Sequence, residues 1–133
     1  MSSDNALPPA APLISVVVPV RNEASNIAPL IAEIRAALAG VAHEIVYVDD
    51  GSTDATPQEL AAAQAEGAPL RMLRHRASCG QSAAVITGVK AAWGEWIATL
   101  DGDGQNDPAD IPRLLARAAA NSRGVVSVDP SST

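Results

Sequence analysis

The sequence has no phenylalanine, and its aromatic residues are Tyr47, Trp93 and Trp96 alone. A hydrophobic core must therefore be built from Val, Ile, Leu and Ala. Hydrophobic residues still make up 47% of the 133 residues, which is typical of a globular protein and excludes a disordered one. This length is sufficient for one domain with a buried core.

Cysteine and long apolar runs are also scarce. The single cysteine, Cys79, excludes an internal disulfide and is typical of a reducing compartment. No apolar run approaches the ~18 residues of a membrane helix. The first 12 residues lack a basic region followed by an apolar stretch, so they do not resemble a signal peptide. We therefore expect a cytoplasmic protein, which could still lie peripherally at a membrane.

The sequence has few basic residues, and its net charge is −6. Nucleic acid is excluded as a partner, because a phosphate backbone needs a basic surface. One basic cluster does occur, at Arg71, Arg74, His75 and Arg76. It could contact a diphosphate or an acceptor phosphate, or it could be a solvated loop.

Zinc-binding and phosphate-cradling motifs are missing as well. Two histidines and one cysteine at scattered positions do not predict a zinc site, and no histidine is paired with Cys79 by spacing. Neither the dinucleotide pattern G-x-G-x-x-G nor the P-loop pattern G-x-x-x-x-G-K-[ST] occurs. Any bound phosphate would therefore need a cation instead of a glycine-rich loop.

Strand-like apolar runs alternate with segments of helical periodicity along the chain. Such alternation predicts an α/β fold, a Rossmann-like parallel sheet flanked by helices. Between the runs we expect helices, one with Pro29 in its first turn and one at 82–93 with Val85, Val89 and Trp93 on one face. We expect a flexible arm at 1–12, one domain at 13–128 and a tail at 129–133. The expected strands are 14–19, 44–48, 70–73, 95–100 and 124–128.

Two carboxylates follow the fourth of these strands. Asp101 and Asp103 are separated by Gly102, and alternate residues of an extended chain share one face. Both could therefore bind one divalent cation, although an ordinary polar turn would have the same composition. A calcium loop is excluded, because Asn106 and Pro112 occupy the positions that need Gly and Glu.

A second acidic pair, Asp49 and Asp50, follows the second expected strand. The carboxyl ends of parallel strands meet at one edge of a sheet, which is where ligands bind in open α/β folds. Asp50 is well placed there to accept a hydrogen bond from a ribose hydroxyl or a base N–H. Gln105 could add a neutral oxygen ligand for a hard cation.

Three motifs together resemble those of the family 2 glycosyltransferases of GT-A fold. They are Val-Pro-Val-Arg-Asn-Glu at 18–23, Val-Asp-Asp-Gly-Ser-Thr-Asp at 48–54, and Leu-Asp-Gly-Asp-Gly-Gln-Asn-Asp-Pro at 100–108. The third is most similar to the dolichyl- or polyprenyl-phosphate sugar transferases. The resemblance covers roughly residues 14–115, nearly the whole chain.

The resemblance implies roles for particular residues. Nucleotide contacts would come from Pro19, Arg21, Glu23, Val48, Asp50, Asp101 and Gly102. Asp101 and Asp103 would be the catalytic carboxylates of a DXD motif. The cofactor would be Mg²⁺ or Mn²⁺, bound by Asp101, Asp103 and Gln105.

The resemblance also implies an activity in the cell envelope. The enzyme would transfer a sugar, with inversion, from a UDP- or GDP-linked donor to a polyprenyl phosphate or similar acceptor. One alternative is a non-catalytic, truncated module that binds the nucleotide sugar without turnover. Another is a nucleotidyltransferase, whose usual glycine-rich, basic first loop is missing. The resemblance further implies that the chain is the nucleotide-binding half of such an enzyme, so we expect slow transfer or none, and self-association through uncovered apolar surface.

Overall fold

The fold is a parallel sheet with helices on both faces, as the alternating pattern predicts. The structure is a computed structural model that describes residues 12–102, 107–119 and 125–127. The expected tail and nearly all of the expected arm lie outside these residues. Within them, the strands form one parallel sheet in the order β3-β2-β1-β4-β5. The strands are β1 (Ile14–Val20), β2 (His43–Asp50), β3 (Leu70–His75), β4 (Trp96–Thr99) and β5 (Val125–Ser127); the helices are α1 (Ala24–Ala37), α2 (Thr56–Ala65), α3 (Gln81–Ala91) and α4 (Asp110–Ala119).

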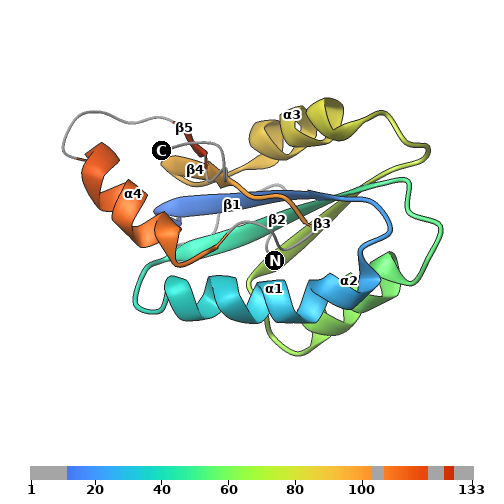
Figure 1. Cartoon of the computed structure of the whole chain (residues 1–133), viewed down its shortest axis with the longest axis horizontal. Helices are drawn as coiled ribbons and strands as arrows, with labels where there is room; N and C mark the ends of the chain where they lie inside the picture. The colour runs from blue at the N-terminus through green and yellow to red at the C-terminus, as the bar shows by residue number, and fades with distance from the viewer. Residues whose placement is uncertain (1–11, 103–106, 120–124, 128–133) are drawn as a thin grey trace, which may run out of the picture.

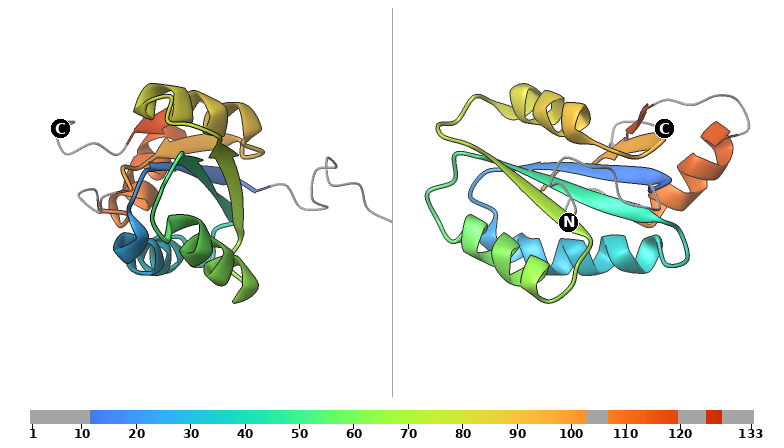
Figure 2. Two further views of the ribbon diagram at one scale, coloured as in Figure 1. Left: turned by 90° about the vertical axis from the view of Figure 1, so that its right-hand side faces the viewer. Right: turned by 180° about the vertical axis from the view of Figure 1, so that it is seen from behind.

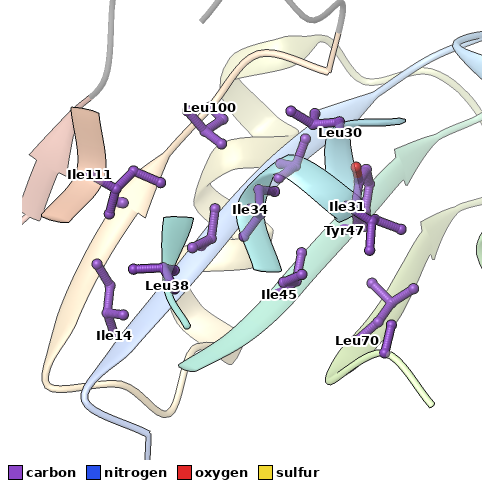
Figure 3. Close-up of a cluster of buried hydrophobic side chains, with 14 of the residues drawn as sticks. Ile14, Leu30, Ile31, Ile34, Leu38, Ile45, Tyr47, Leu70, Leu100 and Ile111 are labelled. Carbon is purple, nitrogen blue, oxygen red and sulfur yellow. The ribbon is translucent and has the colours of Figure 1, made fainter. Parts of the chain in front are cut away.

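The larger core lies between the sheet and helices α1, α2 and α4. Figure 1 shows α1 and α2 below the sheet and α3 above it, and Figure 2 shows the same layers from the side and from behind. β1 is buried along its whole length, as its β-branched sequence predicts for a strand covered on both faces. Side chains from β1, β2, β3, α1 and α4, and from the residues that directly follow α1 and β4, meet in this core (Figure 3): Ile14, Leu30, Ile31, Ile34, Leu38, Ile45, Tyr47, Leu70, Leu100 and Ile111.

Helix α1 forms because its apolar residues recur at helical spacing. Ile27, Leu30, Ile31 and Ile34 are buried on the face toward the sheet. Pro29, expected in the first turn, is instead the sixth residue of the helix. Its side chain is exposed, so the ring faces solvent rather than the core.

Helix α3 approaches the opposite face of the sheet through small residues. Its buried residues are Ala84 and Gly88, whereas Val85 and Val89, the expected apolar face, are only half-buried. A Cβ atom on Gly88 would overlap a methyl group of Val17. The close approach of α3 therefore requires glycine at this position, which hydrophobic periodicity alone does not predict.

The hydroxyl group of Tyr47 is buried in the core without a hydrogen-bond partner among the described residues. Burial also raises the pKa of the Tyr47 hydroxyl above its ordinary value. An unsatisfied buried polar group costs about 1–3 kcal/mol. We therefore predict that Tyr47→Phe leaves the free energy of unfolding unchanged or raises it by up to about 2 kcal/mol. Urea denaturation measures this, and Tyr47→Ala, which creates a cavity, should lower it by about 3–5 kcal/mol.

Large apolar side chains are rarely exposed in the described part of the chain. There, only Leu13 and Ile86 are exposed, at 38% and 54%. Self-association through a broader apolar surface stays a prediction. No helix in this described part of the chain is both long enough and apolar enough to cross a bilayer.

Candidate nucleotide-binding site

A pocket of about 370 Å³ opens at the carboxyl edge of the sheet, where the two acidic pairs were expected to meet. All of the predicted nucleotide-binding residues line it except Val48. The side chain of Val48 is fully buried on the sheet face that α3 covers. The lining residues are Pro19, Val20, Arg21, Glu23, Asp50, Ser78, Gly80, Gln81, Ala84, Asp101 and Gly102.

The turn after β1 is fastened to the loop after β2 through Asn22. This residue has a left-handed backbone conformation, with φ of 56°. Its side-chain oxygen accepts hydrogen bonds from the backbone N–H groups of Thr53 at 2.8 Å and Asp54 at 3.3 Å. Its own N–H donates to Ser52 Oγ at 2.9 Å. Since Arg21 and Glu23 flank Asn22 in the pocket wall, these bonds fix the backbone that carries both.

Asp50 is 4% exposed and binds the loop that precedes α3. One carboxylate oxygen accepts from His75 Nδ1 at 2.7 Å and from the Cys79 N–H at 2.8 Å. The other accepts from Ser78 Oγ and from the Gly80 N–H, both at 2.9 Å. Burial by itself would raise the pKa of Asp50, but these four hydrogen bonds lower it well below its ordinary value. Asp50 is therefore a carboxylate at neutral pH, and it shapes one wall of the pocket.

The basic cluster expected from the sequence lies on β3 and at the residue after it. Three of its four residues pair with carboxylates, so the cluster does not form one basic patch. Arg71 lies toward the amino edge of the sheet, with its guanidinium 3.8 Å from the centre of the Trp93 ring. These contacts stabilise the fold, and Arg71 does not line the pocket that Asp50 and Asp101 share. Arg76 is exposed. The pairs are Arg71 with Glu44 at 2.8 Å, Arg74 with Asp49 at 3.6 Å, and His75 with Asp50 at 2.7 Å.

Asp101 lies across the pocket from Asp50, at the end of the central part of the sheet. Its Oδ1 atom accepts a hydrogen bond from Gln81 Nε2 at 2.8 Å. Gln81 is the first residue of α3, so the loop bound by Asp50 also carries the partner of Asp101. A carboxylate oxygen at this place fits a hard divalent cation. The other predicted cation ligands, Asp103 and Gln105, lie outside the described residues.

Gly102 lies against the end of β1 with no room for a side chain. A Cβ atom there would overlap a methyl group of Val20 and lie 2.9 Å from the Pro19 carbonyl oxygen. We predict that Gly102→Ala displaces the Asp101 segment, lowers the free energy of unfolding by about 1–3 kcal/mol and weakens binding of a nucleoside diphosphate. Thermal unfolding and calorimetry measure the two effects. Equal nucleotide affinity in the parent and in Gly102→Ala would contradict the prediction.

The structure also groups three residues that sequence spacing kept apart. Asp50, His75 and Cys79 each offer a ligand atom, and these atoms lie within 4.8 Å of one another. Spacing along the chain, by which no histidine is paired with Cys79, did not show this grouping. The grouping was missed because Asp50 comes from β2 and His75 from the adjacent β3, where the two residues are register partners.

Fold and pocket together are those of an open α/β protein: a parallel sheet whose carboxyl edge carries an acidic pocket. Residues 15–132 match the family model described as glycosyl transferase family 2. The chain belongs to this family.

Curated relatives point to one branch of the family. The chain is 43% identical over 109 residues to a dodecaprenyl-phosphate galacturonate synthase of Rhizobium johnstonii, covering 77% of this chain and 31% of that protein. It is also 43% identical over 110 residues to an undecaprenyl-phosphate 4-deoxy-4-formamido-L-arabinose transferase of Pseudomonas aeruginosa, covering 80% of this chain and 32% of that one. The chain thus spans about a third of the length of these relatives.

Solved structures agree on the fold. A mannosyltransferase of Pyrobaculum calidifontis, in complex with GDP-Man and Mn²⁺, superposes with a TM-score of 0.68 at 27% identity, covering 90% of this chain and 35% of that one. TarS of S. aureus superposes with a TM-score of 0.64 at 24% identity, covering 80% of this chain and 31% of that one. The GT-A fold that the motifs implied is therefore confirmed.

Proposed function

We propose that the chain carries the nucleotide-sugar site of a metal-dependent glycosyltransferase that moves a sugar from a nucleoside diphosphate to a polyprenyl phosphate. The observation that carries this proposal is the pocket itself. It brings Asp50, from the end of β2, to the same cavity as Asp101, which follows β4. The family membership and the named substrates of the relatives support it.

The two acidic residues would bind different parts of the donor. Asp50 would face the ribose or the base, with Pro19, Arg21 and Glu23 from the turn after β1 beside it. Asp101 would hold the diphosphate through a divalent cation. The solved relative with GDP-Man and Mn²⁺ supports a cation of this type. The absence of a glycine-rich phosphate loop from the sequence gives the same expectation.

Asp101, Asp103 and Gln105 would hold Mg²⁺ or Mn²⁺. When bound, such a cation supplies positive charge where the leaving diphosphate gains negative charge. Gln81 keeps the Asp101 carboxylate oriented toward the pocket through its 2.8 Å hydrogen bond. A lipid phosphate is already anionic near neutral pH, so the acceptor oxygen needs no strong general base. Transfer would invert the anomeric carbon, as the family resemblance implies, at a membrane surface where the lipid acceptor lies.

Release of the nucleoside diphosphate tests this function. The purified chain is mixed with Mn²⁺, a UDP- or GDP-sugar, and undecaprenyl phosphate in detergent micelles. We expect slow release, because the chain spans about a third of the length of its relatives, and this release should require the lipid phosphate and stop with EDTA. Donor binding without lipid-dependent release would instead favour a nucleotide-binding module. Release of pyrophosphate would indicate a nucleotidyltransferase and overturn the proposal.

A further inference from the structure

Asp50, His75 and Cys79 gather where β2 and β3 end and the chain turns toward α3 (Figure 1). Their ligand atoms are a carboxylate oxygen, an imidazole nitrogen and a thiol sulfur, all within 4.8 Å of one another. Zn²⁺ is bound in proteins by these same three ligand types, often with a fourth position left to water. Cys79 is exposed, so a cation can reach the group from solvent.

The imidazole of His75 is held in place from its far side. Its Nε2 atom lies 2.9 Å from Thr87 Oγ1, and that hydroxyl lies 3.0 Å from the Ala83 carbonyl oxygen. The Thr87 hydroxyl can donate its one proton to that carbonyl or to Nε2, so it restrains the ring in either tautomer. Histidines that bind metals through one ring nitrogen typically donate the other N–H to an oxygen, and Thr87 Oγ1 is within reach of Nε2 for that bond. The arrangement leaves Nδ1 as the atom that faces Asp50.

The contact between His75 and Asp50 holds one proton that a cation can replace. Nδ1 lies 2.7 Å from Asp50 Oδ1, and Nε2 lies 2.9 Å from Thr87 Oγ1. Because a carboxylate oxygen only accepts, the Asp50 contact needs a proton on Nδ1 or a cation in its place. Hydrogen bonds from Ser78 Oγ and the Gly80 N–H orient the Asp50 carboxylate from its other oxygen. The Asp50 carboxylate and the His75 ring are therefore both oriented toward the position of the Nδ1 proton.

We propose that Asp50, His75 and Cys79 bind a thiophilic divalent cation, Zn²⁺ above all, and that this cation excludes the nucleoside from the pocket. On binding, Zn²⁺ takes the place of the protons at His75 Nδ1 and Cys79 Sγ; the thiol proton goes to solvent, and the neutral ring keeps one proton, on Nε2. The thiol exchanges its present bond to the Ala77 carbonyl for the metal. This site differs in chemistry from the one at Asp101, where oxygen ligands favour Mg²⁺ or Mn²⁺. The proposed exclusion of the nucleoside rests on the proposed function, because Asp50 lines the nucleotide pocket. The cation site itself does not rest on that function.

Cobalt spectroscopy tests the cation site without any nucleotide. Co²⁺ is titrated into the reduced chain at neutral pH, and near-ultraviolet absorption from thiolate-to-cobalt charge transfer is followed. The chain has one cysteine, so this absorption reports Cys79 alone. We expect saturation at one equivalent and displacement by Zn²⁺. Cys79→Ser should abolish the absorption, and Thr87→Val should weaken Zn²⁺ binding about 10- to 100-fold.

The chain offers a matched control in its other histidine, since His43 lies at the start of β2, at the opposite edge of the sheet. His43→Gln should bind Co²⁺ as the parent does. A titration without the charge-transfer absorption would overturn the site. Undiminished Zn²⁺ affinity in Cys79→Ser, or an equal loss in His43→Gln, would overturn it as well.

Competition between Zn²⁺ and a nucleoside diphosphate tests whether the cation excludes the nucleoside from the pocket. Zn²⁺ should lower the affinity for a nucleoside diphosphate, measured in Mn²⁺, in the parent but not in Cys79→Ser. Cobalt absorption together with unchanged nucleotide affinity would overturn the exclusion and leave the cation site. A chain that shows the cobalt absorption but binds no nucleotide even without Zn²⁺ would contradict the proposed function instead.

Discussion

Asp50→Ala should lower the free energy of unfolding by about 3–5 kcal/mol and remove nucleoside binding with or without metal. Four donors, from the His75 ring, the Ser78 hydroxyl and the backbone of Cys79 and Gly80, lose their acceptor at once. Urea denaturation and calorimetry measure the two losses. Glu33→Ala, which removes an exposed carboxylate on α1, should stay within about 0.5 kcal/mol of the parent. An Asp50→Ala variant as stable as this control would contradict the account of the loop.

The acid sensitivity of the fold gives a second measure of the same carboxylate. The pKa of Asp50 is lower in the folded chain than the value of about 3.9 expected in the unfolded chain. The unfolded state therefore binds the proton first as the pH falls. The stability that Asp50 contributes is complete above about pH 5 and is lost as the pH drops below about 4 toward the lower folded-state pKa. Thermal unfolding from pH 2 to pH 6 should show a weaker acid dependence in Asp50→Asn than in the parent.

Asp101→Ala should remove the dependence of nucleotide binding on metal. If Asp101 holds the diphosphate through a cation, the lost interaction is worth about 1.5–3 kcal/mol, or roughly a ten- to hundredfold loss of affinity in Mn²⁺. In EDTA, the variant and the parent should bind equally. Calorimetric titrations with UDP and GDP measure this. Glu66→Ala is the control, because Glu66 is an exposed carboxylate just beyond α2. A variant whose affinity still rises with Mn²⁺ would remove Asp101 from the cation site.

The sheet could be predicted because β1, β2 and β4 are apolar runs separated by helical segments, although β3 has three basic residues among its six. The acidic pairs at the ends of two strands predicted that the site lies at the carboxyl edge of the sheet. Even so, the interior of α3 was misjudged: bulky Val85 and Val89 suggested the buried face, whereas close approach to the sheet selects Ala84 and Gly88. The size of the apolar side chains is therefore a poor guide to the buried face of a helix that lies close to a strand.

The contacts of Asp50 could not be predicted. Two of its four donors are backbone N–H groups, which every residue except proline carries, so the sequence has no mark of them. The ion pair of Arg71 with buried Glu44 was missed for a related reason. Its partners are 27 residues apart and meet only because β2 and β3 are neighbours.

The central claim is that this pocket binds a nucleoside diphosphate through a divalent cation. The most direct test is calorimetric titration of the parent chain with UDP and GDP, in Mn²⁺ and again in EDTA. We predict that at least one of the two binds in Mn²⁺, that EDTA abolishes or greatly weakens this binding, and that ligand at about 100 times Kd stabilises the fold by about 2.7 kcal/mol. Equal affinity in Mn²⁺ and in EDTA, or no binding of either nucleotide, would contradict the claim.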